Sequence, residues 1–338
     1  MGVKLKPIGE QTIVITGASS GIGRATALMA ADRGAKVVAV ARNETALREV
    51  VREIDDKGGT AIYVVADVSK ADELDNAAQT TVAQYGGFDT WVNDAGVGMY
   101  GRLDQIPLED KRRLFDVTFW GVVNGCRSAL PQLRERGGAI INIGSVESDV
   151  AIPLTGIYAA AKHAVKAYTE TLRMELDHDD VPVSVSLIKP SGIDTPFFRH
   201  ARNHLEVEPQ PTPPVYAAEV VAEAILHCAE HPTPDVVVGG GGKMMSEIRK
   251  GSVRLTDRFM EATQFKGQKT DRPADMYDDI LFDAPTDKGT VGGDYSGHVM
   301  QSSAYTSAKL HPLLGTAVVA GVGLAIAAGV RRFGGRGD

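Results

Sequence analysis

The feature that most constrains the fold is a regular alternation of short β-branched runs with helical patterns, from Gln11 to about Val238. The runs are TIVIT, KVVAV, AIYVV, DTWVN, AIINI, VSVSLI and DVVVG. Strands that alternate with helices are typical of βαβ units, in which crossover helices join parallel strands. We therefore predict an α/β fold with a doubly wound, seven-stranded parallel sheet and helices on both faces.

The 338 residues divide into three regions by composition. Residues 1–240 hold the whole alternating pattern and are expected to form one domain, because the glycine run 239–242 ends the pattern. Residues 241–312 are a polar C-terminal extension, partly loop, with a helix predicted around 253–263 and loop or disorder at 286–298. Residues 313–332 are an apolar segment that is expected to be helical.

Bulk composition excludes several classes of partner and site. With 36 basic and 43 acidic residues, the formal net charge is −7, so we expect no nucleic-acid partner. Cys126 and Cys228 are too few for a disulfide scaffold and lack the paired spacing of a zinc site, so we predict no metal site. The N-terminus runs almost directly into a strand pattern without a secretory signal, which favours a cytoplasmic protein.

The apolar segment is a candidate for membrane contact. Residues 313–330 carry no charge and would span about 27 Å as a helix, just enough to cross a hydrocarbon core. Ala317, Gly321, Ala325 and Gly329 repeat every four residues, a spacing that lets helices approach closely in lipid. A buried helix or a Gly/Ala-rich tail explains the same composition, and both interpretations stay open.

A glycine motif follows the first predicted strand directly. Thr16-Gly-Ala-Ser-Ser-Gly-Ile-Gly23 leads into a helical pattern that begins near Ile22. Gly17, Gly21 and Gly23 leave room for a tight turn, so that a pyrophosphate can sit at the helix N-terminus. The position between strand and helix favours dinucleotide binding over a purely structural turn.

The end of the second predicted strand indicates which dinucleotide is preferred. NAD sites usually have an acid here for the adenosine ribose, whereas an arginine can accept the 2′-phosphate of NADP. The sequence has no acid at this point, and Arg42 follows the strand at once. We predict NADP(H) as the preferred cofactor, with NAD(H) still usable; a solvated surface arginine is the alternative.

Taken in order, these motifs resemble the short-chain dehydrogenase/reductases, which are single-domain, Rossmann-fold, NAD(P)-dependent oxidoreductases. The resemblance covers about residues 10–240 and includes the glycine motif, Asp67 in VVADVS, NDAG at 93–96, Ser145, the Tyr158/Lys162 pair and PSGIDT at 190–195. It implies cofactor contacts from Gly17, Ser19, Ser20, Gly21, Ile22, Gly23, Arg42, Asp67, Val68, Asn93, Ala95, Gly96, Tyr158, Lys162, Pro190, Ile193 and Thr195.

The same resemblance implies a catalytic set of Ser145, Tyr158 and Lys162. Reduction of a carbonyl needs a proton donor at the developing alkoxide. In the family this donor is the tyrosine that Tyr158 matches. We expect the Lys162 cation, one helical turn away, to lower the pKa of the phenol, and Ser145 to stabilise the substrate oxygen. By itself, the Tyr158/Lys162 spacing would also suit an ordinary amphipathic helix.

Two positions depart from the family pattern. Thr118 stands where the family often has an asparagine that helps to relay protons toward the lysine, and we expect an altered relay with Thr118 as a weaker participant. Asn124 lies six residues further along and roughly opposite on a helix, so it does not inherit the role. Asp94 replaces the second asparagine of the NDAG motif and adds an acid near the cofactor.

These observations support an NADP-preferring oxidoreductase that interconverts a secondary alcohol and a ketone or aldehyde. A dinucleotide-binding scaffold or sensor with little turnover is the alternative, and a lipid-metabolising reductase anchored through 313–330 is a third reading. The Pro-rich segment after Thr195 is predicted to be an active-site lid. The resemblance also implies a homo-oligomer that pairs the helices containing Thr118 and Tyr158.

Overall fold

In a computed structural model of the chain, the seven predicted runs form one parallel sheet. The structure describes residues 3–241, 247–248, 251–274 and 279–310. The sheet order is β12-β7-β6-β4-β1-β2-β3, which confirms the predicted doubly wound fold and puts the reversal of strand order between β1 and β4. Its strands are β1 (Thr12–Thr16), β2 (Lys36–Ala41), β3 (Thr60–Val65), β4 (Thr90–Asn93), β6 (Gly138–Ile143), β7 (Val183–Pro190) and β12 (Asp235–Val238).

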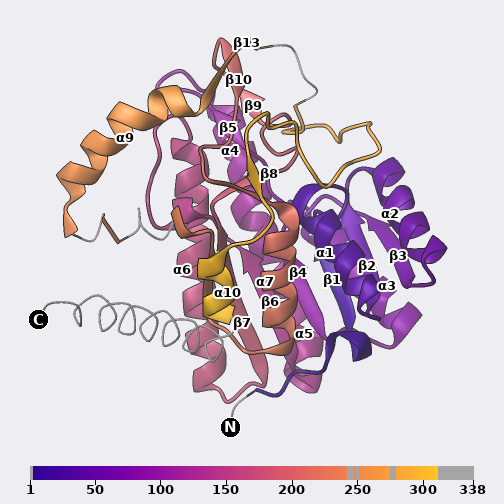
Figure 1. Ribbon diagram of the computed structural model, residues 1–338. Helices are drawn as coiled ribbons and strands as arrows, with labels where there is room; N and C mark the ends of the chain where they lie inside the picture. The colour runs from indigo at the N-terminus through magenta and orange to yellow at the C-terminus, as the bar shows by residue number, and fades with distance from the viewer. Residues whose placement is uncertain (1–2, 242–246, 249–250, 275–278, 311–338) are drawn as a thin grey trace, which may run out of the picture.

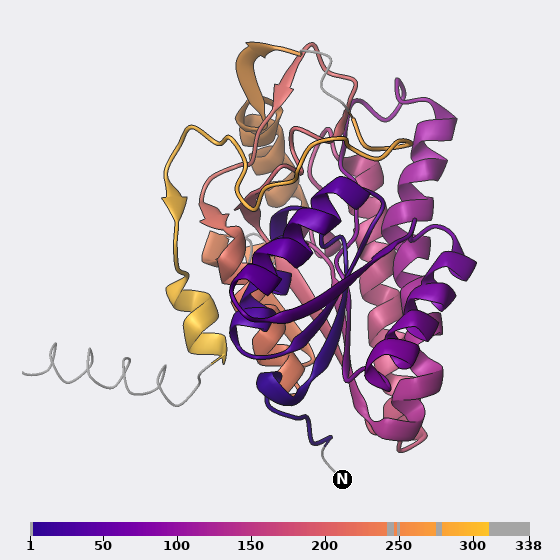
Figure 2. The same cartoon turned by 90° about the vertical axis from the view of Figure 1, so that its right-hand side faces the viewer.

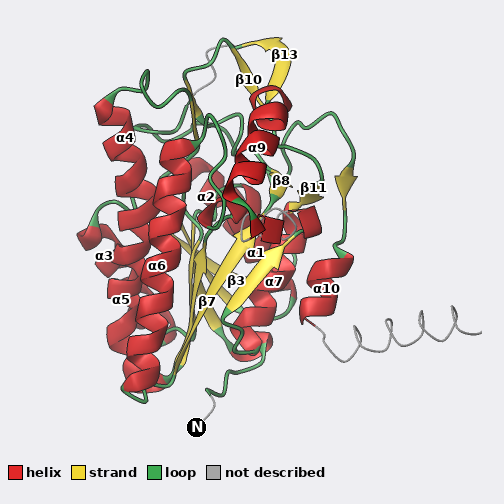
Figure 3. Ribbon diagram, turned by 90° about the vertical axis from the view of Figure 1, so that its left-hand side faces the viewer, coloured by secondary structure: helices red, strands yellow, loops and turns green. Residues whose placement is uncertain are grey.

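Helices cover both faces of this sheet (Figure 3). One layer holds α1 (Gly21–Asp32), α2 (Glu44–Asp56) and α7 (Ala218–Glu230); the other holds α3 (Ala71–Tyr85), α4 (Leu108–Phe115), α5 (Gly121–Arg136) and α6 (Gly156–His178). Each layer closes one apolar core against the sheet. Strands β1 and β7 are therefore buried along their whole length, which explains the apolar run of β1, whereas β7 also buries Ser184 and Ser186.

A π-helical turn, η2 (Asp116–Trp120), joins α4 to α5 without a break. Thr118 lies in this turn and is fully buried. Single π-helical turns within α-helices frequently occur at functional sites. The turn thus marks the part of the helix that faces the carboxyl edge of the sheet.

Short strands form a cap beyond the carboxyl ends of the main strands, at the top of Figure 1. They pair as β8 (Gly192–Asp194) with β11 (Val215–Ala217) and β14 (Val299–Met300), β5 (Met99–Tyr100) with β9 (Arg202–Asn203), and β10 (Val207–Pro209) with β13 (Lys269–Pro273). Residues 1–240 also contain two single turns of 3₁₀ helix, η1 (Ile8–Glu10) and η3 (Val146–Ser148). The cap contains strands from both the first 240 residues and the extension.

The extension supplies α9 (Val253–Gly267), where a helix was expected, and α10 (Ala304–Leu310), which packs on β12 and α7. Between them, residues 280–290 form an irregular loop that passes above the N-terminal end of α1 (Figure 2). We call residues 280–290 the crossing loop. None of the helices in the described ranges is long and apolar enough to span a membrane, and the apolar segment at 313–332 lies outside those ranges.

Candidate active site

A cleft runs along the carboxyl edge of the sheet and brings most of the predicted site residues together. Open α/β sheets bind their ligands at this edge, beside the point where strand order reverses. The predicted residues that line the cleft are Gly17, Ser19, Ser20, Gly21, Ile22, Arg42, Asp67, Val68, Ala95, Gly96, Ser145, Tyr158, Lys162, Pro190, Ile193 and Thr195. Gly23, Asn93 and Thr118 are not among its lining residues.

The glycine turn has the geometry of a phosphate cradle. Gly17 (φ +75°) and Gly21 (φ +54°) adopt left-handed backbone conformations that other residues rarely accept. A Cβ on Gly17 would lie 2.9 Å from the Ala95 nitrogen, and one on Gly23 would lie 2.4 Å from the Gly17 carbonyl oxygen. The turn and the start of α1 can pack this closely only without side chains, and the helix N-terminus then faces the cleft.

Asn93 takes part in the structure beneath the cleft. Its side chain is 2% exposed and donates a 2.8 Å hydrogen bond to Asn142 Oδ1 while accepting one of 2.9 Å from Trp91 Nε1. The amide thus links neighbouring strands at the end of β4. The structure does not bring the Asn93 side chain to the cleft surface, because these bonds hold it within the core.

Ser145, Tyr158 and Lys162 meet at the other end of the cleft. Ser145 follows β6, and its hydroxyl accepts a 3.1 Å hydrogen bond from the Glu147 amide. Lys162 follows Tyr158 by one turn of α6, and its ammonium lies 5.7 Å from the centre of the tyrosine ring. The same ammonium donates a 2.6 Å hydrogen bond to the carbonyl of Ile143. The sheet and one long helix therefore hold all three side chains rigidly.

Burial dominates the electrostatics of this end. It lowers the pKa of Lys162 to about 8, against the opposing effect of the Asp94 and Glu147 carboxylates. It also raises the pKa of Tyr158 above the ordinary value, and Glu147 adds to that rise while a hydrogen bond with Ser145 counteracts it. The expected lowering of the Tyr158 pKa by Lys162 does not hold in the chain alone. Tyr158 is consequently a protonated phenol, as a proton donor must be.

Asp94 lies between the glycine turn and the lysine. Its Oδ2 would be 2.8 Å from a Cβ on Gly23, and it accepts a hydrogen bond from the Gly23 backbone. Burial raises the pKa of Asp94 to about 7, and the Lys162 cation partly offsets that rise. The departure from the family pattern thus adds a titratable group whose charge acts on the Lys162 cation.

Thr118 and Asn124 occupy different surroundings, as predicted from their helical spacing. The Thr118 hydroxyl accepts a long, 3.4 Å hydrogen bond from the Val97 amide, and a Cβ built on Gly96 would lie 4.0 Å from that hydroxyl and 3.9 Å from the Lys162 ammonium. Asn124 instead donates a 2.9 Å bond to the Val68 carbonyl near the adenosine end. Thr118 and Lys162 thus both approach Gly96, but Thr118 is not among the residues that line the cleft.

Glu147 is a site residue that sequence reasoning missed. It lines the cleft, is 9% exposed, and accepts a 2.6 Å hydrogen bond from the Thr155 hydroxyl. Burial raises its pKa to about 8, while Thr155 and Lys162 oppose the rise. An acid two residues after Ser145, at the end of an apolar strand, was the available signal.

Aromatic side chains cover the end of the cleft where Ser145, Tyr158 and Lys162 lie, which we call the catalytic end because of the roles predicted for these residues. Phe197 and Phe198 line the cleft, and the Phe197 ring packs edge-on against Tyr158 with their centroids 5.5 Å apart. The chain that follows Phe198 is attached to the rest of the domain where β9 pairs with β5. The segment predicted to be a lid thus places an apolar cover beside Tyr158.

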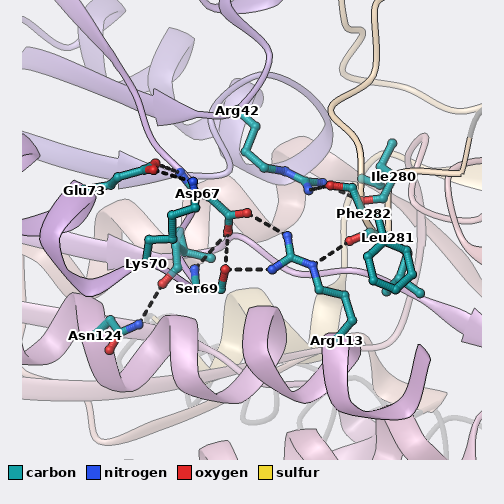
Figure 4. A network of polar contacts seen from close by, with 11 residues as sticks. Arg42, Asp67, Ser69, Lys70, Glu73, Arg113, Asn124, Ile280, Leu281 and Phe282 are labelled. Atoms are coloured by element: carbon teal, nitrogen blue, oxygen red, sulfur yellow. Dashed lines mark hydrogen bonds and ion pairs between the residues drawn. The ribbon is translucent and has the colours of Figure 1, made fainter. Parts of the chain in front are cut away.

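The extension reaches the opposite end of the cleft (Figure 4). Arg42 donates hydrogen bonds to the backbone carbonyls of Ile280 and Phe282, the latter at 3.0 Å. Arg113, from α4, pairs with Asp67 at 2.6 Å and donates a 2.9 Å bond to the Leu281 carbonyl. Sequence reasoning anticipated Arg42 and Asp67 here but missed Arg113 and the crossing loop, because polar loop sequence carries no signal of its partners.

This arrangement suits a dinucleotide and an oxygen-bearing substrate. The glycine cradle and helix N-terminus can bind a pyrophosphate, and the end of β2 offers a cation for a further phosphate. The far end combines a phenol, a hydroxyl and an ammonium beneath an apolar roof. Such a set can hold a carbonyl or alcohol oxygen and exchange a proton with it.

Comparisons with known proteins agree with this geometry. A family model described as short chain dehydrogenase matches residues 11–206. The chain is 44% identical over 327 residues to the uncharacterized oxidoreductase YxnA of Bacillus subtilis (strain 168), with 95% of this chain and 91% of that protein covered. An alignment of that length necessarily includes most of the extension.

Solved structures resemble the sheet domain. A short-chain dehydrogenase/reductase from Burkholderia phymatum in complex with NAD matches with a TM-score of 0.67 and 27% identity, over 75% of this chain and 96% of that chain. An alcohol dehydrogenase from Thermococcus sibiricus complexed with 5-hydroxy-NADP matches with a TM-score of 0.59 and 25% identity, over 67% and 95% of the two chains. One of these two similar proteins is thus complexed with NAD and the other with 5-hydroxy-NADP.

Proposed function

The chain belongs to the short-chain dehydrogenase/reductase family of NAD(P)-dependent oxidoreductases, and on that premise we propose that it interconverts an alcohol and the corresponding carbonyl compound, a secondary alcohol with a ketone or a primary alcohol with an aldehyde, with NADP(H) preferred. The observation that carries the proposal is the convergence of Ser145, Tyr158 and Lys162 on the wall of one cleft, with Arg42 at its other end. Fold alone would not identify a reaction, whereas these side chains have the chemistry that one requires.

Tyr158 is the proton donor for reduction and the acceptor for oxidation. Its pKa lies above the ordinary value because it is buried, so the phenol stays protonated until the substrate oxygen gains negative charge. Ser145 would donate a hydrogen bond to the same oxygen and stabilise that charge. When bound, the nicotinamide supplies or accepts the hydride.

Lys162 would orient the nicotinamide ribose and favour the deprotonated form of Tyr158 during the reaction. Its pKa of about 8 keeps it largely cationic at neutral pH. Asp94 is electrostatically coupled to Lys162, and Thr118, like Lys162, approaches Gly96, so both would contribute to proton exchange with the lysine. We include Thr118 as a relay residue that acts through Lys162.

The cofactor set comprises the residues predicted from the sequence and present in the cleft, with the glycine turn at the pyrophosphate and Pro190, Ile193 and Thr195 near the nicotinamide. The preference for NADP rests on Arg42. Its guanidinium lies at the end of β2, where a 2′-phosphate would need a partner.

The decisive experiment measures NADPH and NADH binding, then NADPH oxidation with a panel of ketones and aldehydes, for the wild type and Tyr158→Phe. We expect the variant to lose about 10²–10⁴-fold in turnover, the usual contribution of a general acid, with NADPH affinity nearly unchanged. Tight binding without turnover by the wild type would instead favour a dinucleotide-binding scaffold, and activity gained in Thr118→Asn would argue against that scaffold.

A further inference from the structure

The crossing loop is anchored at both sides by apolar contacts. At its start, Leu281 is fully buried in the same core as Leu114 and Val117. Beyond its end, β14 pairs with β11, and Leu310 of α10 is buried in the other core. The loop is therefore a span of irregular chain with firmly packed ends.

The middle of the loop is attached by polar bonds alone among the contacts described for it. The Gly21 amide donates a 2.8 Å bond to the Thr290 carbonyl, and Arg24 donates one of 3.1 Å to the Gly289 carbonyl. Asn43 donates a 2.8 Å bond to the Asp287 carbonyl. These donors come from the glycine turn, α1 and the end of β2, the elements expected to surround the adenosine half of the cofactor.

The loop lies directly against the glycine turn. A Cβ on Gly289 would be only 2.1 Å from the Ser19 carbonyl oxygen, so a side chain at 289 would force the two segments apart. Gly289 also has a φ of +67°, a conformation that favours glycine. Ile280 and Pro285 line the cleft together with Ser19, which puts the loop on the outer wall of the dinucleotide site.

One carboxylate connects the loop to the substrate lid. Asp287 Oδ2 lies 3.1 Å from a guanidinium nitrogen of Arg199 and 3.3 Å from His200 Nε2. Arg199 and His200 directly follow Phe198, which roofs the catalytic end. Asp287 thus joins segments that cover the two ends of one cleft.

We propose that the crossing loop is a cofactor clasp, which covers the adenosine half of the bound dinucleotide and must detach before the cofactor is released. Asp287 is its latch. The bonds that attach the middle of the loop are polar and lie near the surface, so water can replace them and the middle can detach while the apolar anchors stay in place. The inference rests on the proposed dinucleotide site and adds a gate to it that belongs to the extension.

A gate limits both binding and release, and this gives a kinetic test. We would measure association and dissociation of NADPH by stopped-flow fluorescence for the wild type, Asp287→Ala and Thr286→Ala. Thr286 is the matched control, because it is exposed, lies beside Asp287 and makes no side-chain bond described for it. We expect Asp287→Ala to accelerate both rate constants by about tenfold, the effect of removing 1.4 kcal/mol from the closed state.

The expected pattern includes a dissociation constant within about threefold of the wild type, since both rates rise together. Faster release with unchanged association would overturn the clasp, because Asp287 would then stabilise only the complex. Unchanged rates would overturn it as well. If Asp287→Ala folds poorly, Asp287→Asn keeps the size of the side chain and removes its charge, and the same two rates decide.

The outcomes for the clasp and for the proposed function are separable. Failure of the wild type to bind either dinucleotide would refute the proposed function. Normal binding by the wild type with equal rates in Asp287→Ala would refute the clasp alone.

Discussion

The two ends of the cleft are built in different ways. At the catalytic end, Ser145, Tyr158 and Lys162 come from one strand and the helix that follows it, within 18 residues of sequence. At the adenosine end, Arg42 and Asp67 come from the sheet domain, but their surroundings include carbonyls of the crossing loop more than 200 residues later.

The two ends of the cleft therefore depend on different parts of the chain. Residues 1–240 alone position Ser145, Tyr158 and Lys162, whereas the extension contributes to the surroundings of Arg42 and Asp67. The proposed catalytic groups are positioned by a buried strand and a long helix, which are rigid. The adenosine end depends on a loop with packed anchors and a polar middle, which can move at lower cost. We therefore expect variants at the two ends to change different measurable quantities.

The largest effect is expected at the catalytic end. Ser145→Ala removes a hydrogen bond to the developing charge on the substrate oxygen and should lower turnover by about 10²–10³-fold, with little change in NADPH affinity. Steady-state kinetics on any reducible carbonyl would measure it. Ser148→Ala is the control, because the Ser148 hydroxyl accepts a bond from the Ser145 amide, and an equal loss there would mean that loop geometry rather than the Ser145 hydroxyl matters.

A second prediction concerns the anchor of the crossing loop. Leu281 is fully buried, so Leu281→Ala should lower the free energy of unfolding by about 2–3 kcal/mol through lost apolar contacts and a cavity. Urea denaturation would measure the change. Phe282→Ala, at a neighbour that is 41% exposed, should cost much less, and equal losses would show that the loop is not anchored at Leu281.

Arg42→Ala should lower cofactor affinity, and by a smaller amount. Loss of charge-assisted bonds to a 2′-phosphate is expected to weaken NADPH binding about 10–100-fold, whereas NADH binding should stay nearly constant. Titration with both cofactors would measure this, with the exposed Arg48→Ala as control. Equal weakening of both would mean that Arg42 acts by holding the crossing loop and leaves cofactor choice undetermined.

The smallest effect is a shift in pH dependence at the catalytic end. If the Lys162 cation is required, activity should fall as the pH rises through about 8. The Asp94 carboxylate raises the pKa of Lys162, so Asp94→Asn should move this alkaline limb to lower pH. A pH–rate profile would show it, with the exposed Asp72→Asn as control. An unmoved limb would exclude coupling between Asp94 and Lys162.

Much of the sheet domain was predictable because its determinants are local. Runs such as TIVIT and VSVSLI are rich in β-branched residues and are buried on both faces, so their composition marks the strands directly. The lysine one turn after Tyr158 likewise follows from helical geometry. The chain's resemblance to a known family supplied the roles that we propose for these residues, which local geometry could not.

Other features depend on distant contacts. Burial and the two nearby carboxylates set the pKa of Tyr158, against the direction expected from Lys162 alone. Glu147 became a site residue only because η3 turns it into the cleft. Arg113 and the crossing loop meet Arg42 and Asp67 from unrelated parts of the chain, and neither partner can be identified from its own neighbours in sequence.

The sequence by itself therefore determined the α/β fold, the order of its strands along the chain, and the spacing of the glycine turn and the Tyr158/Lys162 pair. These follow from side-chain periodicity and backbone geometry over a few residues. Tertiary structure alone decided how deeply the acids beside Lys162 are buried and that residues 280–290 cover the adenosine end. Both depend on which segments pack together, because desolvation and long-range hydrogen bonds arise only when the chain is folded.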